Sequence, residues 1–479
     1  MSDIRNNRAE MRDAAGHGRQ LRRRSPWAWI PTLYVAEGLP YFAVNVLTVL
    51  MYTNMGIGLA EMAFYTGWLY LPWVIKPFWS PFVDLFKTKR LWTLAMQLLI
   101  AMAMGAVGLL LPTPFFFSAT LVCFWLMAFF SATHDIAADG YYMLELDSHD
   151  QAAYVGVRST FYRIASVIGQ GGLVILAGYL EERCERISTA WSLVFLLLSA
   201  FFAVIFFYHI FAMPRSPKDK PLPGVRPSTI AREFGMTFVT FFRKPYIWSA
   251  LAFMLLYRLP EAMCVKLVQP FLKAPLSDGG LGLSTSQIGF VNGTVGVIAL
   301  LAGGILGGIA ISRGGLKKWL WPMALSLTLP CVFYCGLAMF QPSSFTLICA
   351  AIGVEQFGYG FGFTAFMLYL IYFSRGESQT SHYAFCTAFM ALGMMLPGMA
   401  AGWLHDVFSQ YNLFGMAGPQ GYVNFFWWVM LCCVATFAVC LRLRIDPEFG
   451  KKSVSDNSTA ADDRSTSVCD SSAKKEVNE

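Results

Sequence analysis

Residues 188–213 read STAWSLVFLLLSAFFAVIFFYHIFAM, 26 residues without Asp, Glu, Lys or Arg. A helix that crosses a membrane needs about 20 mostly apolar residues, and this stretch meets that requirement. Similar stretches recur along the whole chain of 479 residues. We expect an all-α integral membrane protein with twelve transmembrane helices, at residues 28–52, 61–82, 91–112, 115–142, 152–180, 188–213, 246–272, 286–312, 318–340, 343–374, 380–404 and 421–443.

The composition excludes several classes of protein. Hydrophobic residues make up 56% of the chain and charged residues 14%, whereas a soluble domain carries about 25% charge. An ordinary soluble enzyme, a disordered scaffold and a nucleic-acid-binding domain are therefore not expected. Most of the 11 cysteines lie in apolar stretches and none forms a CxxC pair, so we expect neither disulfides nor a metal site, and no cofactor.

The positive charge is mainly a signal of topology. With both termini in the cytoplasm, 28 of the 36 Lys and Arg residues fall in cytoplasmic segments, and three fall in the connections on the other side. The Arg-rich segment before residue 28 lacks a signal-peptide cleavage site, so we expect the first helix to stay as an anchor. The expected location is the inner membrane, as a multi-pass and monomeric protein.

Internal similarity predicts two six-helix pseudo-repeats. Leu39-Pro40 and Leu259-Pro260 are 220 residues apart, as are Asp135 and Glu355. Parallel repeats of this kind enclose a substrate path between them. The expected divisions are a cytoplasmic N-tail at 1–27, an N-terminal bundle at 28–213, a basic cytoplasmic linker at 214–245, a C-terminal bundle at 246–443 and a disordered cytoplasmic C-tail at 444–479.

Ionisable side chains inside the spans are the candidate functional residues, because charge is costly in a membrane interior. Asp135 and Asp139 lie four residues apart on one face of a helix, beside His134, which could titrate near neutral pH. We interpret these three residues as a proton-coupling site. The alternative is that the carboxylates pair with Arg158 or Arg163 and hold two helices together.

The C-terminal half offers candidate sites in its first and fourth helices. Arg258, Glu261 and Lys266 surround Pro260, which permits a break that would expose backbone groups to a substrate. The alternative is a kink with a local salt bridge. Glu355 precedes the glycines of EQFGYGFGF at 355–363, and we interpret it as a further proton or substrate site, or as a by-product of close helix packing.

Three other side chains complete the predicted substrate site. Glu37 stands next to Gly38-Leu39-Pro40, in the position that matches the Pro260 break, and is a predicted substrate contact. Tyr359 lies within the glycine-rich segment, and Trp73 could stack on a sugar ring. Membrane-interface aromatic belts are the alternative explanation for Trp73.

The segment KPFWSPFVD at 76–84, followed by a short basic loop, resembles the loop after the second helix of the major facilitator superfamily. In that superfamily an acid and basic residues form a cytoplasmic gate. The resemblance therefore implies a gating role for Asp84, Lys89 and Arg90, and a major facilitator fold that works by rocking of its two halves.

Within that superfamily the chain most resembles the AmpG-type muropeptide permeases and the related acetyl-CoA transporters. The resemblance rests on EGLPYF at 37–42, on KPFWSPFVD, and on HDIAADGYYMLELD at 134–147 followed by VGVRSTFYRIASVIGQGG at 155–172. It implies a proton-driven symporter that imports GlcNAc-anhydroMurNAc, with or without peptide, for peptidoglycan recycling.

The sequence therefore predicts a secondary active transporter with a small, sugar-containing substrate, a lipid bilayer around it and no nucleic-acid partner. Alternatives are a major facilitator transporter of another metabolite, either acetyl-CoA-like or sugar-containing, or a drug exporter. A membrane enzyme or sensor is a further alternative, but we find no nucleophile motif, metal-ligand cluster or sizeable soluble domain.

Overall fold

The computed structural model describes residues 25–146, 148–217, 219, 227–376, 379–415 and 419–450. These residues are almost entirely helical, and no strand occurs among them, as the sequence predicts. The predicted N-tail, basic linker and C-tail lie partly outside the described residues. The helices group into two compact units, which are treated separately below.

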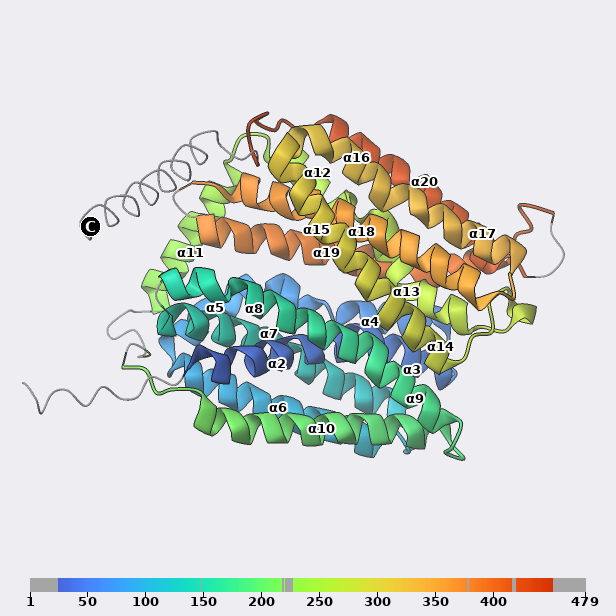
Figure 1. Ribbon diagram of the computed structural model, residues 1–479, viewed down its shortest axis with the longest axis horizontal. Helices are drawn as coiled ribbons and strands as arrows, with labels where there is room; N and C mark the ends of the chain where they lie inside the picture. The colour runs from blue at the N-terminus through green and yellow to red at the C-terminus, as the bar shows by residue number, and fades with distance from the viewer. Residues whose placement is uncertain are drawn as a thin grey trace, which may run out of the picture. The chain divides into compact units, whose positions relative to one another are not determined.

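The first unit falls within Met1–Gly56 and Ile75–Ile230. Two long helices, α6 and α7, pack side by side, and α10 packs on α6 while α8 packs on α2 (Figure 1). Its principal elements are α2 (Ile30–Phe42), η2 (Ala43–Leu47), α3 (Thr48–Asn54), α5 (Leu71–Leu85), α6 (Lys89–Leu110), α7 (Phe116–Glu145), α8 (Ser148–Val167), η3 (Ile168–Gly172), α9 (Leu173–Glu181) and α10 (Ile187–Ala212).

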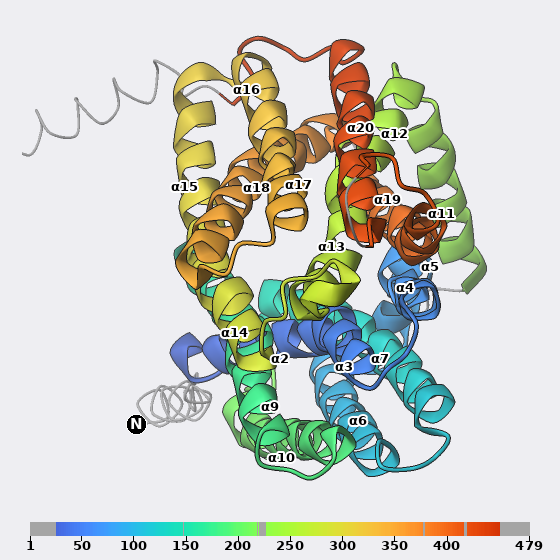
Figure 2. The ribbon, with the colours of Figure 1, turned by 90° about the vertical axis from the view of Figure 1, so that its right-hand side faces the viewer.

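The second unit falls within Ile57–Val74 and Ala231–Glu479. Helix α18 packs along α15 and α16, and α19 packs against α4, α13 and α20 (Figure 2). Its principal elements are α4 (Leu59–Trp68), α11 (Pro227–Phe242), α12 (Ile247–Leu256), α13 (Leu259–Lys273), α14 (Thr285–Gly289), η5 (Phe290–Gly296), α15 (Val297–Gly314), α16 (Leu316–Thr328), α17 (Val332–Phe340), α18 (Phe345–Ser374), α19 (Gln379–Ser409) and α20 (Gly421–Leu441).

The units differ from the predicted bundles in residues 57–74, which we placed in the N-terminal bundle and which pack with α19 and α13. Glycines permit this close packing, because a Cβ on Gly67 would collide with Met399 and a Cβ on Gly402 would collide with the backbone of Leu59. The bundle boundaries given above stay predictions.

Ten helical stretches of the described chain are long and apolar enough to cross a membrane. The two predicted spans without such a stretch, 61–82 and 246–272, are each divided into two shorter helices, α4 with α5 and α12 with α13. In both cases a proline is the second residue of the second helix, Pro72 in α5 and Pro260 in α13. Proline has no N–H to donate to the preceding turn, so the helix restarts there. A count of twelve spans is compatible with this arrangement.

Pro40 has a different effect, because it stays inside α2. The turn that follows it, η2, is a π-helical segment, and a second π-helical segment, η3, packs against it. A Cβ on Gly169 of η3 would collide with the side chain of Phe42. The predicted break at Pro260 is therefore present, while the equivalent position in α2 is a local widening of a continuous helix.

Glycines determine how closely α18 approaches its two neighbours. A Cβ on Gly303 of α15 would collide with the carbonyl oxygen of Phe357, and one on Gly360 would collide with that of Leu300. A Cβ on Gly358 would collide with the carbonyl oxygen of Ser326 on α16. Backbone-to-backbone contact of this kind is a main source of helix association in membranes.

We predict that Gly303→Ala lowers the thermal unfolding midpoint of the purified protein, because the added methyl group forces α15 and α18 apart at a cost of about 1–3 kcal/mol. Gly308→Ala is the matched control in the same helix, because no atom lies near its Cβ position. That control should unfold at or slightly above the wild-type temperature. A Gly303→Ala protein as stable as the control would contradict the packing argument.

Candidate functional site

A group of charged side chains lies on the face that α7 turns towards its neighbours in the first unit. The Asp135 carboxylate is 3.5 Å from the ammonium group of Lys76 on α5. One turn further along, the Asp139 carboxylate is 2.8 Å from the guanidinium group of Arg158 on α8. Tyr34 on α2 donates a hydrogen bond to Asp139 at 3.2 Å, and its ring lies under Arg158. The two aspartates thus connect α7 to three other helices.

Glu37 belongs to the same group of charges. Its side chain is 8% exposed and makes no hydrogen bond or ion pair with the part of the chain that the structure describes. The charges that act on it are those of Asp135, Asp139, Lys76 and Arg158. A buried carboxylate without a partner is costly in its ionised form.

His134 does not join this group, although it was expected to. Successive residues of a helix point about 100° apart, and His134 faces α6 while Asp135 does not. The Nε2 atom of His134 lies 3.0 Å from the amide nitrogen of Gln97. The amide oxygen of Gln97 lies 3.0 Å from Nδ1 of His209. Thr32 extends this buried chain at 2.8 Å from His209. His134 therefore belongs to a polar contact of α6, α7 and α10, and its role in proton coupling stays a prediction.

Two of the three predicted gate residues, Lys89 and Arg90, lie at the start of α6, and the third, Asp84, belongs to α5. The backbone N–H groups of Lys89 and Arg90 donate to the Asp219 carboxylate at 2.7 and 2.9 Å, which caps the helix. The Arg90 guanidinium donates to the carbonyl oxygens of Ile210 and Met213 at the end of α10. The side chain of Asp84 lies outside the described residues, so the gate stays a prediction.

In the second unit, a bidentate ion pair lies at the break between α12 and α13. Arg258 donates two hydrogen bonds of 2.7 Å to the carboxylate of Glu261. It also donates to the Tyr359 hydroxyl at 3.0 Å, and its guanidinium lies 4.7 Å from the ring centre of Phe363. This is the local salt bridge that the sequence allowed as the alternative to substrate contact, and Tyr359 is brought to it as part of the site.

Lys266 is a buried cation without a carboxylate partner. Its side chain is 1% exposed, and its ammonium group donates to the Thr66 hydroxyl at 3.0 Å. The ring of Tyr70 lies 5.3 Å away. No described carboxylate comes within ion-pair distance of it, so the charge is balanced only by a hydroxyl dipole and a ring face.

Glu355 is a buried carboxylate held by neutral donors. The hydroxyl group of Tyr334 donates to it at 2.9 Å and the amide of Gln356 at 2.8 Å. Glu261 and the thiol of Cys264 also lie close enough to influence it. Both interpretations of this region are compatible with the structure, since the glycines pack closely and the carboxylate remains without a described cation.

Several partners were not identified from the sequence. Lys76 could have been, because it is an ionisable residue inside a span, and the same rule that selected Asp135 applies to it. Tyr334 and Tyr34 gave no signal, since tyrosine is common in apolar helices. Trp73 is half-buried near the start of α5, and its predicted stacking on a sugar stays a prediction.

These side chains can bind and exchange protons or hold a polar solute. Among the described residues, no group of three or more His, Cys, Asp or Glu side chains is placed to hold a metal ion. The carboxylates differ in whether they form an ion pair. Asp135, Asp139 and Glu261 each form one. Glu37 and Glu355 form none with a described residue. The unpaired carboxylates are the ones able to gain a proton without breaking an ion pair.

Comparison with known proteins agrees with a membrane transporter. The model of the BT1 family matches residues 35–333. The anhydromuropeptide permease of Escherichia coli is 26% identical over 392 residues, covering 80% of this chain and 75% of the permease. A putative transporter, AmpG 4, of Rickettsia conorii is 24% identical over 372 residues, covering 75% of this chain and 85% of its own.

Solved structures of transporters share the fold. A POT family transporter in complex with 5-aminolevulinic acid superposes with a TM-score of 0.66 at 11% identity, covering 87% of this chain and 96% of its own. A D-xylose–proton symporter superposes with a TM-score of 0.63 at 13% identity, covering 89% of this chain and 99% of its own. With a family model that matches more than half of its length, the chain belongs to the BT1 family and is a multi-pass membrane transporter of the AmpG type, not an enzyme.

Proposed function

We propose that this transporter imports anhydromuropeptides, GlcNAc-anhydroMurNAc with or without peptide, together with protons across a bacterial inner membrane, for recycling of the cell wall. The substrate class is supported by the similarity to the anhydromuropeptide permease. Proton coupling is supported by one observation above the others, the imbalance of charge around Glu37.

The charges around Glu37 do not cancel. Glu37, Asp135 and Asp139 are three carboxylates, and Lys76 and Arg158 are the cations whose charges act on Glu37. The two aspartates form ion pairs with the two cations, so Glu37 is the carboxylate without an ion-pair partner. Burying an uncompensated charge costs several kcal/mol, and protonation removes that charge. Binding of one proton therefore neutralises the group as a whole.

Glu355 is the second candidate for a proton carrier. Tyr334 and Gln356 are neutral donors that favour the carboxylate, while burial opposes it. Gaining a proton would cost Glu355 no ion pair. Glu261, which accepts two hydrogen bonds from Arg258, would have to give up an ion pair to gain one.

Lys266 is the candidate contact for the anionic part of the substrate. Muropeptides carry a carboxylate, on the lactyl group or on the peptide. A buried ammonium group next to a threonine hydroxyl and a tyrosine ring suits a carboxylate, which would replace the weak partners that the cation has now. An aromatic ring beside it also suits the face of a sugar.

The first test is uptake of labelled GlcNAc-anhydroMurNAc into proteoliposomes that contain the purified protein. We expect accumulation above the external concentration when an inward proton gradient is present, and only equilibration when an uncoupler dissipates it. Equal internal and external concentrations under the gradient would overturn proton coupling. The absence of any transport by folded protein would overturn the substrate.

The carboxylate prediction separates coupling from binding. Glu37→Gln and Glu355→Gln imitate the protonated side chains, so we expect each variant to lose gradient-driven accumulation at least about tenfold, or ~1.4 kcal/mol. Exchange of labelled for unlabelled substrate across the membrane should continue, because it needs no net proton movement. Glu182→Gln, at an exposed acid, is the control and should behave as wild type. Normal accumulation in both test variants would remove these carboxylates from the mechanism.

The Lys266 prediction concerns substrate affinity. A lost charge-assisted hydrogen bond is worth about 1.5–3 kcal/mol, so Lys266→Gln should raise the KM for uptake about tenfold or more. Lys273→Gln is the matched control on the same helix, since Lys273 also donates to a threonine hydroxyl, that of Thr285. A substrate whose carboxylate is converted to an amide should be transported equally by wild type and Lys266→Gln. An unchanged KM in the variant would contradict the assignment.

A further inference from the structure

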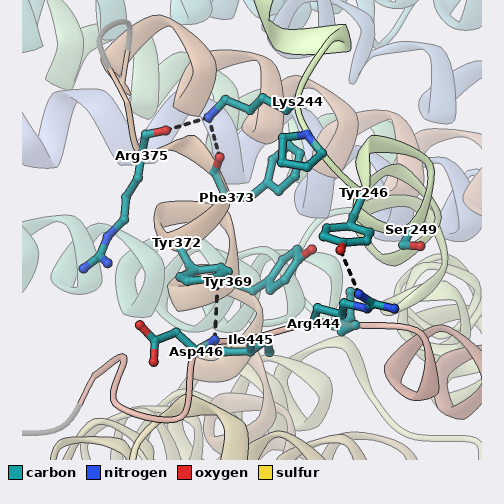
Figure 3. A pocket seen from close by; sticks show the side chains of 12 residues that line it. Lys244, Tyr246, Ser249, Tyr369, Tyr372, Phe373, Arg375, Arg444, Ile445 and Asp446 are labelled. Carbon is teal, nitrogen blue, oxygen red and sulfur yellow. Dashed lines mark hydrogen bonds between the residues drawn. The ribbon is translucent and has the colours of Figure 1, made fainter.

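A cavity of about 470 Å³ lies where α11 meets α12 and where α18 and α20 end, in the second unit (Figure 3). Three of its lining side chains are cations, Lys244, Arg375 and Arg444, and one is an acid, Asp446. Figure 3 shows the two arginines on opposite sides of Tyr369. No proton or substrate role assigned above involves this cavity.

The two arginines offer hydrogen-bond donors that the described chain leaves available. The Arg375 guanidinium stacks on Phe449 at 4.3 Å from the ring centre and makes no hydrogen bond or ion pair with a described residue. The Arg444 guanidinium stacks on Tyr246 at 4.8 Å and donates to its hydroxyl group at 2.8 Å. Stacking on a ring orients the planar donors while leaving their edges exposed, which suits a phosphate.

Tyrosine hydroxyl groups add neutral donors to the same cavity. The hydroxyl oxygens of Tyr246 and Tyr372 accept hydrogen bonds, from Arg444 and from the backbone N–H of Asp446. Their own hydrogens therefore remain available. The Asp446 carboxylate accepts from the backbone N–H of Glu448 and pairs with neither arginine.

Lys244 has a structural role in this cavity. Its ammonium group donates to the carbonyl oxygens of Phe373 and Arg375 at 2.6 and 2.8 Å, so it caps the end of α18. Burial lowers the pKa of this lysine from its ordinary value. The cavity is thus rich in donors and poor in acceptors, and its complement is an anion with several acceptor oxygens.

An apolar groove of about 350 Å³ lies along α12 and α20 and shares Ser249 in its lining with this cavity. On α12 it is lined by Trp248, Ala252 and Leu256, spaced four residues apart on one face. On α20 it is lined by Ala435, Ala438 and Val439, and Arg442, which follows the last residue of α20 and has no described side-chain partner, also lines it. The small alanines leave space between α12 and α20, which pack side by side (Figure 2).

The geometry points to a binding site for an anionic phospholipid, with the phosphate beside Arg444 in the cavity that Arg375 also lines, and one acyl chain in the groove between α12 and α20. The groove side of α12 spans about 12 Å from Trp248 to Leu256, the length of a substantial part of an acyl chain. Trp248 is 78% exposed beside the basic cavity, the arrangement of aromatic and basic groups expected where spans meet lipid headgroups.

A soluble phosphate compound shares the chemistry of the lipid headgroup but has no acyl chain to occupy the groove. The apolar lining and the shared wall at Ser249 therefore favour the lipid. The two sources can be distinguished, because filling the groove affects the lipid alone.

The test is native mass spectrometry of the purified full-length protein with added dioleoyl-phosphatidylglycerol or dioleoyl-phosphatidylcholine. We expect preferential retention of phosphatidylglycerol by wild type. The double variant Arg375→Gln/Arg444→Gln should bind it about 30-fold more weakly, from roughly fivefold for each arginine at a membrane surface. Arg313→Gln/Lys317→Gln removes the same charge from a neighbouring basic pocket and should retain wild-type binding.

The groove is tested with Ala438→Leu, which narrows it and leaves the arginines in place. This variant should bind phosphatidylglycerol more weakly, while glycerol 1-phosphate should compete poorly against the lipid on wild type.

Three outcomes would contradict the proposal. An equal loss of phosphatidylglycerol binding in both double variants would reduce the effect to general surface charge and overturn the site. Lipid binding unaffected by Ala438→Leu, with full competition by glycerol 1-phosphate, would overturn the lipid in favour of a soluble anion. Equal retention of the two lipids would also contradict the proposal.

Discussion

Charge inside an apolar membrane interior is the constraint on which this structure most depends. Each ionisable side chain there must find a partner or give up its charge. Asp135 forms an ion pair with Lys76, and Asp139 forms one with Arg158. These pairs position α5 and α8 relative to α7. Both ion pairs form because α7 is rotated so that Asp135 faces α5 and Asp139 faces α8. Removal of either cation would leave a partly buried carboxylate uncompensated.

The same constraint explains where helices are interrupted. Pro260 removes a backbone hydrogen bond between α12 and α13, and Arg258 and Glu261 stand directly around the gap. Glu261 lies in the first turn of α13, where a negative charge is favoured by the helix dipole, and it holds the arginine there. The helix dipole thus favours the charge of Glu261, and Glu261 in turn binds Arg258. In α2, where Glu37 precedes Pro40 without a partner, the helix continues and only widens.

The sequence predicted the helical architecture because an uncharged stretch such as 188–213 has no alternative in a membrane. It also predicted the face shared by Asp135 and Asp139, and it offered pairing with Arg158 as one alternative, which the structure confirms. The proton-coupling role of His134 stays a prediction, and its contact with Gln97 on α6 could not be predicted from its position beside Asp135, because successive residues of a helix point in different directions. Contacts such as Tyr334 with Glu355 could not be predicted, because they depend on how α17 and α18 pack.

Each unit holds a buried ionisable group that lacks an ion-pair partner among the described residues, and this bears on coupling. The first unit holds the Glu37 carboxylate, and the second holds the Lys266 ammonium group as well as the Glu355 carboxylate, which accepts only from neutral donors. Protons neutralise the carboxylates, and an anionic substrate neutralises Lys266. A conformational change that carries these groups through apolar surroundings costs least when all of them are neutral, so a transporter loaded with only protons or only substrate is at a disadvantage. Under the proposed function, coupling between proton and substrate follows from the burial of charge and needs no direct contact between them.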